Sequence, residues 1–222
     1  MLCALAIASH GRGSEASADG EFEKAIGLMK SDEHLQAAKI LESLISRTKS
    51  PEPKDKYLYV TATCYRKAGQ LEKAISDYKR VARDNGSIFA EIARFRIARE
   101  YQNLRNYEGA SEEYEAILSN HPGSFSAADA QYQLGECYFA MKQHEAAIDH
   151  YRKFIESYPE GGRARLAAYK IGYVYQVLKR WQEAYSQYQK VIRQNMKDYA
   201  AQCAVEKART LVSSCPTLNV TL

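Results

Sequence analysis

The feature that most constrains this chain is an alanine that recurs at a nearly constant spacing. Five alanines stand 37, 36, 37 and 37 residues apart, and a large side chain follows each of them by four residues. The pairs are Ala37 and Leu41, Ala74 and Tyr78, Ala110 and Tyr114, Ala147 and Tyr151, and Ala184 and Tyr188. Because residues four apart share one face of a helix, each pair indicates a packed helix. A period this steady is typical of a repeat array, in which each unit buries its apolar face against its neighbours.

Each repeat predicts two helices joined by a short turn. In the clearest repeat the first helix carries Leu134, Gly135 and Tyr138, and the second carries Ala147 and Tyr151. The small residues recur because two helices approach closely there and a neighbouring aromatic ring needs the room. We therefore predict an all-α solenoid of five helical hairpins over residues 20–195, at about 20–50, 54–86, 87–122, 124–159 and 161–195. An amphipathic helix at 197–214 is predicted to cap the array, and residues 215–222 form a tail.

Glycine and proline predict where two of the helices end. Gly69 follows Tyr65 by four residues, at a position where a helix end favours positive φ. Pro51 and Pro53 cannot continue a helix, so the segment from Ser50 is predicted to end the first hairpin. The repeat phase is kept across this segment, which is therefore not a domain boundary.

The chain carries only a small net charge. With 31 Lys and Arg against 27 Asp and Glu, the net charge of +4 is too small for a general nucleic-acid footprint. The stretch from 161 to 197 nevertheless carries eight basic residues and one acid, Glu183. Two interpretations stay open for it, solvated helix faces or a patch for an acidic peptide or lipid head group.

The N-terminus, residues 1–19, is predicted to be flexible. It begins with an apolar run from Leu2 to Ala8, in which Ala6-Ile7-Ala8 has the form of a signal-peptidase site, but a basic region is missing. It is either the remnant of a secretion signal or an ordinary flexible terminus. No other segment approaches the roughly 20 apolar residues that a membrane span requires.

The cysteines and histidines do not have the spacing of a metal site or of a catalytic site. The five cysteines do not have the spacing of metal ligands. Cys64 and Cys137 are expected to pack as small apolar residues. Cys203 could form a disulfide with Cys215 only if the chain reverses after the last helix. His144 begins a sequence like a zinc-protease motif, but Ile148 stands where the second ligand would be. We expect no metal, no cofactor and no catalytic constellation, so the chain is not predicted to be an enzyme.

The markers Leu134-Gly135-x-x-Tyr138, Ala147-x-x-x-Tyr151 and Pro159 resemble the tetratricopeptide repeat. The resemblance covers about residues 20–195 and implies a right-handed solenoid that binds protein or peptide partners without catalysing a reaction. Two departures stand out. The period exceeds the usual value of about 34, and the position that is often Trp in the family is here Glu21, Leu58, Arg94, Gln131 and Ala168.

A longer pattern narrows the resemblance. Pro122-x-Ser124-x-x-Ala127-x-x-Ala130-x-Tyr132-x-Leu134-Gly135, echoed from Pro159 to Gly172, is similar to repeats of bacterial cell-envelope proteins. Those proteins are of the type of the Tol-Pal-associated cell-division coordinator and the outer-membrane assembly lipoprotein. The resemblance implies a periplasmic or cell-envelope adaptor. A cytoplasmic adaptor and a recruiting subunit of an envelope enzyme complex remain alternatives.

In such repeats the first helices of the hairpins line the concave surface, which places a ladder of aromatic residues there. The ladder is Phe22, Tyr59, Phe95, Tyr132 and Tyr169. It either anchors a partner or packs between repeats. A varying column beside it is expected to be exposed, because a core position would not tolerate Arg, Glu and Thr in turn. From that column we predict partner contacts by Arg66, Arg99, Glu136, Phe139 and Tyr173, and the oligomeric state is left open.

Overall fold

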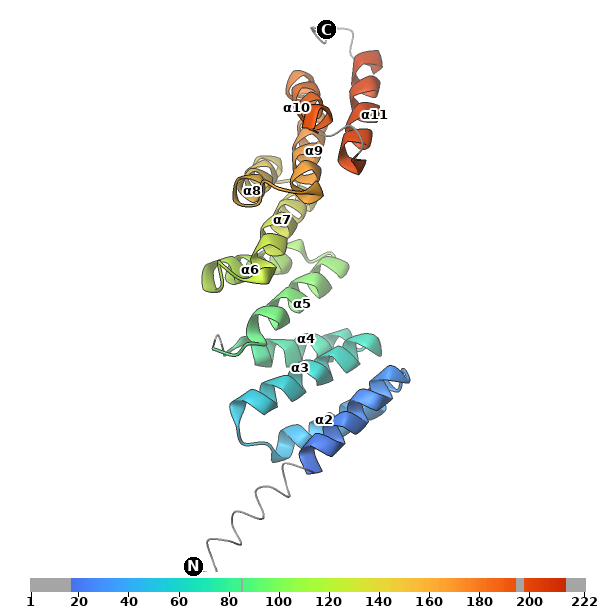
Figure 1. The fold of residues 1–222 in the computed structure, drawn as a ribbon, viewed down its shortest axis with the longest axis vertical. Helices are drawn as coiled ribbons and strands as arrows, with labels where there is room; N and C mark the ends of the chain where they lie inside the picture. The colour runs from blue at the N-terminus through green and yellow to red at the C-terminus, as the bar shows by residue number, and fades with distance from the viewer. Residues whose placement is uncertain (1–16, 85, 195–197, 215–222) are drawn as a thin grey trace, which may run out of the picture. The chain divides into compact units, whose positions relative to one another are not determined.

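The computed structural model describes residues 17–84, 86–194 and 198–214, and in these residues every regular element is a helix (Figure 1). No strand occurs in the described part, so the all-α prediction is confirmed. The chain divides into two compact units, residues 1–100 and 101–222. Each unit is an array of helices that pack in chain order.

The first unit begins with a helix over residues 17–30, which is followed by four others. These are α2 (His34–Arg47), α3 (Pro51–Lys67), α4 (Leu71–Ala82) and α5 (Ala90–Asn103), whose last turn belongs to the second unit. Helix α3 packs against both α2 and α4. It starts three residues earlier than predicted, because Pro51 occupies the first turn, where a missing N–H leaves no helical hydrogen bond unmade.

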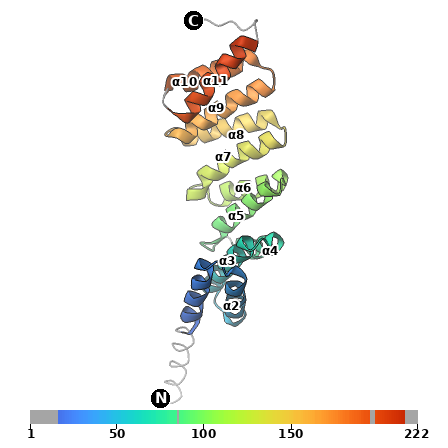
Figure 2. The ribbon, with the colours of Figure 1, turned by 90° about the vertical axis from the view of Figure 1, so that its right-hand side faces the viewer.

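The second unit repeats its helices with a constant offset. It holds α6 (Tyr107–Asn120), α7 (Phe125–Ala140), α8 (His144–Ser157), α9 (Gly162–Val177), α10 (Trp181–Gln194) and α11 (Tyr199–Ser214). Successive helices pack against one another, and α11 also packs against α9 (Figure 2). The bounds of α7, α9 and α11 are 37 residues apart, and so are those of α6, α8 and α10. Helix α11 therefore stands where the first helix of another hairpin would stand.

A buried tyrosine lies on the second helix of four hairpins, and Leu41 takes its place in the first. Tyr78, Tyr114, Tyr151 and Tyr188 are all 0% exposed. In two hairpins the ring lies directly on a glycine: a Cβ added to Gly135 would lie 2.5 Å from Cε1 of Tyr151, and one added to Gly172 would lie 2.6 Å from Cε1 of Tyr188. This confirms that small residues recur where a ring needs space.

A second set of tyrosines joins neighbouring hairpins. The Tyr138 hydroxyl on α7 donates to Glu115 on α6 at 2.7 Å, and Arg152 on α8 donates to the Tyr175 hydroxyl on α9 at 2.6 Å. The hydrogen bond to Glu115 raises the pKa of Tyr138 to about 12, because the neutral phenol is the form that donates. Each of these bonds links the second helix of one hairpin to the first helix of the next.

Every turn inside a hairpin contains one residue with positive φ. The residues and their φ values are Asp32 (60°), Gly69 (78°), Arg105 (58°), Lys142 (62°) and Lys179 (60°). At the second turn, the Gln70 N–H donates to the Tyr65 carbonyl at 2.9 Å, which closes the end of the helix. The prediction for Gly69 is confirmed. The other four turns hold the same conformation with larger residues, for which it is strained.

Candidate interaction surface

The predicted contact residues divide equally between the two units. The first unit holds Phe22, Tyr59, Arg66, Phe95 and Arg99, and the second holds Tyr132, Glu136, Phe139, Tyr169 and Tyr173. The structure therefore describes two separate groups of these side chains, one in each unit.

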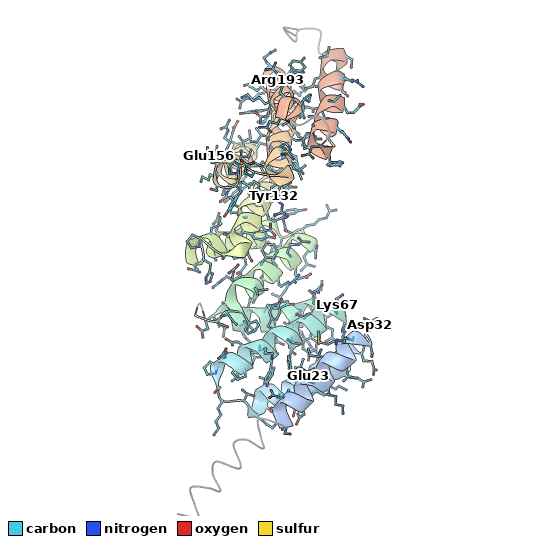
Figure 3. The ribbon with its side chains drawn as sticks, in the orientation of Figure 1. Glu23, Asp32, Lys67, Tyr132, Glu156 and Arg193 are labelled. Atoms are coloured by element: carbon cyan, nitrogen blue, oxygen red, sulfur yellow. The ribbon has the colours of Figure 1, made fainter. Side chains whose placement is uncertain are left out.

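In the second unit the aromatic ladder mostly packs against the core. Tyr132 is only 8% exposed (Figure 3), and its ring centroid lies 5.7 Å from that of Tyr151 and 5.5 Å from that of Phe154. Burial is the main reason that the pKa of Tyr132 is raised. Tyr169 is partly exposed, with its ring 5.7 Å from Tyr188. Tyr132 thus contributes packing, while Tyr169 offers an edge to solvent.

In the first unit the same ladder is half-buried. The Tyr59 ring lies 5.5 Å from Tyr78 and 5.8 Å from Phe89, and its hydroxyl accepts a long hydrogen bond of 3.4 Å from Arg96. The Phe22 ring lies 5.3 Å from that of Tyr57, and the Lys56 ammonium stands 4.0 Å above it. These rings combine a packed face with an accessible one.

Polar side chains in the varying column beside the aromatic ladder have a role that the sequence pattern did not reveal. Each buried hairpin tyrosine directs its hydroxyl to a polar side chain on the preceding helix of its hairpin. The pairs are Tyr78 with Thr63 (2.9 Å), Tyr114 with Gln102 (2.9 Å), Tyr151 with Glu136 (2.6 Å) and Tyr188 with Gln176 (2.9 Å). A buried hydroxyl without a partner would destabilise the fold, so the column must supply one. The partner precedes the tyrosine by 15 or 12 residues, and these two positions lie about one helical turn apart on the same face of the preceding helix.

Three helices of the second unit share one continuous surface, which we call the odd-helix face. It consists of Glu136 and Phe139 on α7, Lys170 and Tyr173 on α9, and Lys207 on α11. Glu136 accepts from Tyr151 with one carboxylate oxygen and from the Lys170 ammonium, 3.0 Å away, with the other. The rings of Phe139 and Tyr173 lie 5.7 Å apart, and the Lys207 ammonium lies 5.5 Å from the Tyr173 ring centroid.

All five residues of the odd-helix face are partly exposed. Two of them, Lys170 and Lys207, were not predicted. Their partners lie on neighbouring helices, so only the packing of one hairpin on the next reveals them.

The first unit places the predicted arginines differently. Arg66 on α3 lies 3.8 Å from the carboxylate of Glu100, which is buried, and Arg99 on α5 is exposed. Arg66 is thus held near an acid of its own unit, whereas Arg99 points to solvent.

Four of the eight basic residues in the stretch from 161 to 197 form ion pairs with acids. Lys170 pairs with Glu136, and Arg180 lies 3.0 Å from Glu145 and 2.9 Å from Glu183. Two further pairs join Arg163 to Asp129 and Arg165 to Asp198. The hydrogen bond from Arg165 lowers the pKa of Asp198. This pairing favours the interpretation of charged helix faces over a patch for an anionic ligand.

The histidines pack against aromatic rings. The His144 ring lies 5.6 Å from that of Phe139, and the His150 ring stacks on Tyr138 at 4.8 Å and 9°. Burial lowers the pKa of His150. Across residues 17–84, 86–194 and 198–214, no group of three His, Cys, Asp or Glu could hold a metal ion. None of the helices in those ranges has the length and the apolar character of a membrane span.

The cysteines of the described residues form no disulfide with one another. Cys64 and Cys137 are 0% exposed, as expected of small packing residues, and burial raises the pKa of each to about 11. Cys203 is partly exposed. Cys215 lies outside the described residues, so the possible pair with Cys203 stays a prediction.

Known proteins match this chain through its repeats. Models of the tetratricopeptide repeat match residues 57–85, 93–122, 129–161 and 166–195, which is more than half of the chain. No curated protein matches it.

Two solved structures illustrate the likeness in fold. A tetratricopeptide repeat protein from Parabacteroides merdae ATCC 43184 has a TM-score of 0.70 at 17% identity, covering 89% of this chain and 74% of that one. MamA from Desulfovibrio magneticus RS-1 has a TM-score of 0.62 at 18% identity, covering 79% and 93%. Identities this low show the fold alone, and the matching models distinguish no cell-envelope subtype.

Proposed function

This chain belongs to the tetratricopeptide repeat family, and we propose that it is a scaffold that holds a partner protein or peptide on the odd-helix face. Repeats of this family imply protein partners, and proteins built from them are typically non-catalytic. The family models that match the chain are of this repeat, and the proposed role of the chain is binding.

The observation that carries this proposal is the composition of the odd-helix face. The rings of Phe139 and Tyr173 provide apolar area at its centre, where aromatic side chains commonly dominate the binding energy. Glu136, Lys170 and Lys207 surround them with charges that can fix the orientation of a bound chain. Lys207 contacts the Tyr173 ring and has no acidic partner in the described part of the chain, which favours a carboxylate on the partner.

A site-specific photo-cross-linker tests the proposal. Benzoylphenylalanine placed at Tyr173 in the full chain should capture a partner in native cells. The same group at Glu156, an exposed residue of α8, serves as the matched control (Figure 3). A partner captured at Glu156 and not at Tyr173 would move the binding surface away from the odd-helix face. The absence of any partner at Tyr173 would contradict the proposal.

We further propose a location in the bacterial cell envelope. The support is the signal-like Ala6-Ile7-Ala8, which lies outside the described residues, and the resemblance of the longer repeat pattern to envelope proteins. The cytoplasmic adaptor and the enzyme-recruiting subunit are the alternatives. A fusion of the full gene to alkaline phosphatase should be active in the periplasm, whereas an inactive, stable fusion indicates a cytoplasmic protein. An enzyme activity that co-purifies with the chain and is absent from the isolated chain would indicate the recruiting role.

A further inference from the structure

Helix α11 is built like the first helix of a sixth hairpin. Its bounds follow those of α9 by 37 residues, and four of the positions that α9 buries are also buried in α11, at 201, 204, 208 and 211. Ala167 and Ala204 are both 0% exposed, and Ile171 and Ala208 are 3% and 5% exposed. The two helices therefore present equivalent faces to the preceding part of the array.

On α9, a further strip is covered by the second helix of the same hairpin. The Tyr188 ring on α10 lies against Gly172, its hydroxyl donates to Gln176, and Gln187 donates to the Ala168 carbonyl at 3.3 Å. The equivalent strip on α11, 37 residues further on, consists of Val205, Arg209 and Ser213. No described helix covers it.

That strip instead lines a groove between α10 and α11, which we call the end groove. Its cavity is about 430 Å³, and its walls are Tyr185, Gln189 and Ile192 of α10 and Val205, Arg209 and Val212 of α11. Val212 is 43% exposed, whereas Tyr175 at the equivalent place on α9 is 8% exposed. Tyr185 is partly exposed, whereas Ile148 at its place on α8 is 0% exposed. The end groove is therefore the position that a helix fills one hairpin earlier.

One residue changes what can fit there. Arg209 takes the position of Gly172, where even a Cβ would meet the tyrosine ring at 2.6 Å, so a helix with a tyrosine at that point fits less well than on α9. Arg209 is exposed and makes no ion pair or hydrogen bond among the described residues. Its side chain lines the end groove beside apolar walls. A carboxylate on an incoming helix would satisfy it.

We propose that the end groove binds an amphipathic helix of another protein, with an acidic residue facing Arg209. The apolar residues of that helix, spaced three and four apart, would cover Tyr185, Ile192 and Val212, as helices do when they dock in apolar grooves. This surface is separate from the odd-helix face and does not depend on the function proposed for that face.

Two stapled, fluorescein-labelled helical peptides test the proposal against the full chain. One has the sequence of α10, Trp181–Gln194, which fits the repeat pattern, and the other carries Tyr188→Glu. The full chain should bind the glutamate peptide about five-fold more tightly, the size expected of one partly exposed ion pair. The Arg209→Gly variant, which restores the small residue of α9, should reverse the preference. Binding of both peptides should be lost in Val212→Asp, which changes an exposed residue and should leave the circular dichroism melt unchanged.

Four outcomes would overturn the proposal. The first is equal binding of the two peptides, and the second is a preference that Arg209→Gly does not change. The third is a chain that sediments as a dimer and becomes monomeric with Val212→Asp, because the end groove is then covered by a second copy of the chain. Failure of both peptides to bind also counts against it, since their helicity is verified beforehand by circular dichroism.

Discussion

Replacing Gly172 with alanine tests whether ring packing on glycine sets the spacing of the helices in a hairpin. The added Cβ would lie 2.6 Å from Cε1 and 2.8 Å from Cδ1 of Tyr188, where carbon atoms normally stand about 3.5–4.0 Å apart. The ring must move by about 1 Å. It is 0% exposed and its hydroxyl donates to Gln176, so it cannot move without disturbing the core and this bond.

The expected loss in unfolding free energy is about 1–3 kcal/mol. Overpacking a core costs about 1–3 kcal/mol, and losing the hydrogen bond costs about 1 kcal/mol. The higher helix propensity of alanine offsets about 1 kcal/mol of this loss. Alanine stands at the equivalent place in the sequence of another hairpin, at Ala62 before Tyr78, so the penalty arises from the closer approach of α9 and α10 rather than from alanine itself.

The assay is urea unfolding followed by the fluorescence of Trp181, the single tryptophan of the chain, which begins α10. Gly27→Ala is the matched control: no atom lies within 4 Å of its added Cβ, and helix propensity should stabilise its helix by about 1 kcal/mol, measured by circular dichroism. In a Tyr188→Leu background the penalty of Gly172→Ala should shrink. A Gly172→Ala variant as stable as the wild type, or more stable, would refute the reasoning.

Three more predictions follow from individual contacts. Lys142→Gly should raise the unfolding free energy by up to about 1 kcal/mol in urea melts, because glycine tolerates the positive φ of 62° that strains a lysine; a loss of stability would contradict this. In a variant that keeps only Cys64, Cys137 and Cys203, a thiol reagent at pH 8 should label Cys203 quickly. The two buried thiols, whose pKa is about 11, should react only after denaturation. Rapid labelling of all three thiols in the folded protein would contradict the burial of Cys64 and Cys137. Because the pKa of Asp198 is lowered in the folded state, the ionised carboxylate stabilises the fold at neutral pH, and this contribution is lost as the pH falls below the ordinary pKa of 3.8. Asp198→Asn should therefore remove this part of the acid dependence of the urea midpoint. A variant with the same pH profile as the wild type would contradict the prediction.

The sequence predicted the hairpins because spacing alone determines them. The alanine and tyrosine of each second helix must face the core together, and Gly135 and Gly172 mark the points of closest approach. The turn at Gly69 was predictable for a similar reason, since glycine favours positive φ. Lys142 holds the same conformation, but a lysine carries no such preference, so its turn was not recognised from residue type.

The candidate surface was harder to predict, because its residues depend on distances between hairpins. Glu136 was expected as an exposed contact residue, yet its carboxylate also holds the buried Tyr151 hydroxyl, which only the depth of that ring reveals. Lys170 and Lys207 contact residues of adjacent helices, Glu136 and Tyr173, which the sequence pattern does not bring together. The match between α9 and α11 was concealed in the sequence because Arg209 and Val212 replace the marker glycine and tyrosine.

The bond between each hairpin tyrosine and its polar neighbour restricts how this surface can diversify. A hydrophobic substitution of Glu136 is compatible with folding only if the Tyr151 hydroxyl finds another acceptor. Variants of this face are therefore limited by folding before they are selected for binding. A library that keeps hydrogen-bonding residues at 63, 102, 136 and 176 and randomises the positions beside them should therefore yield far more folded clones than one that randomises the whole face.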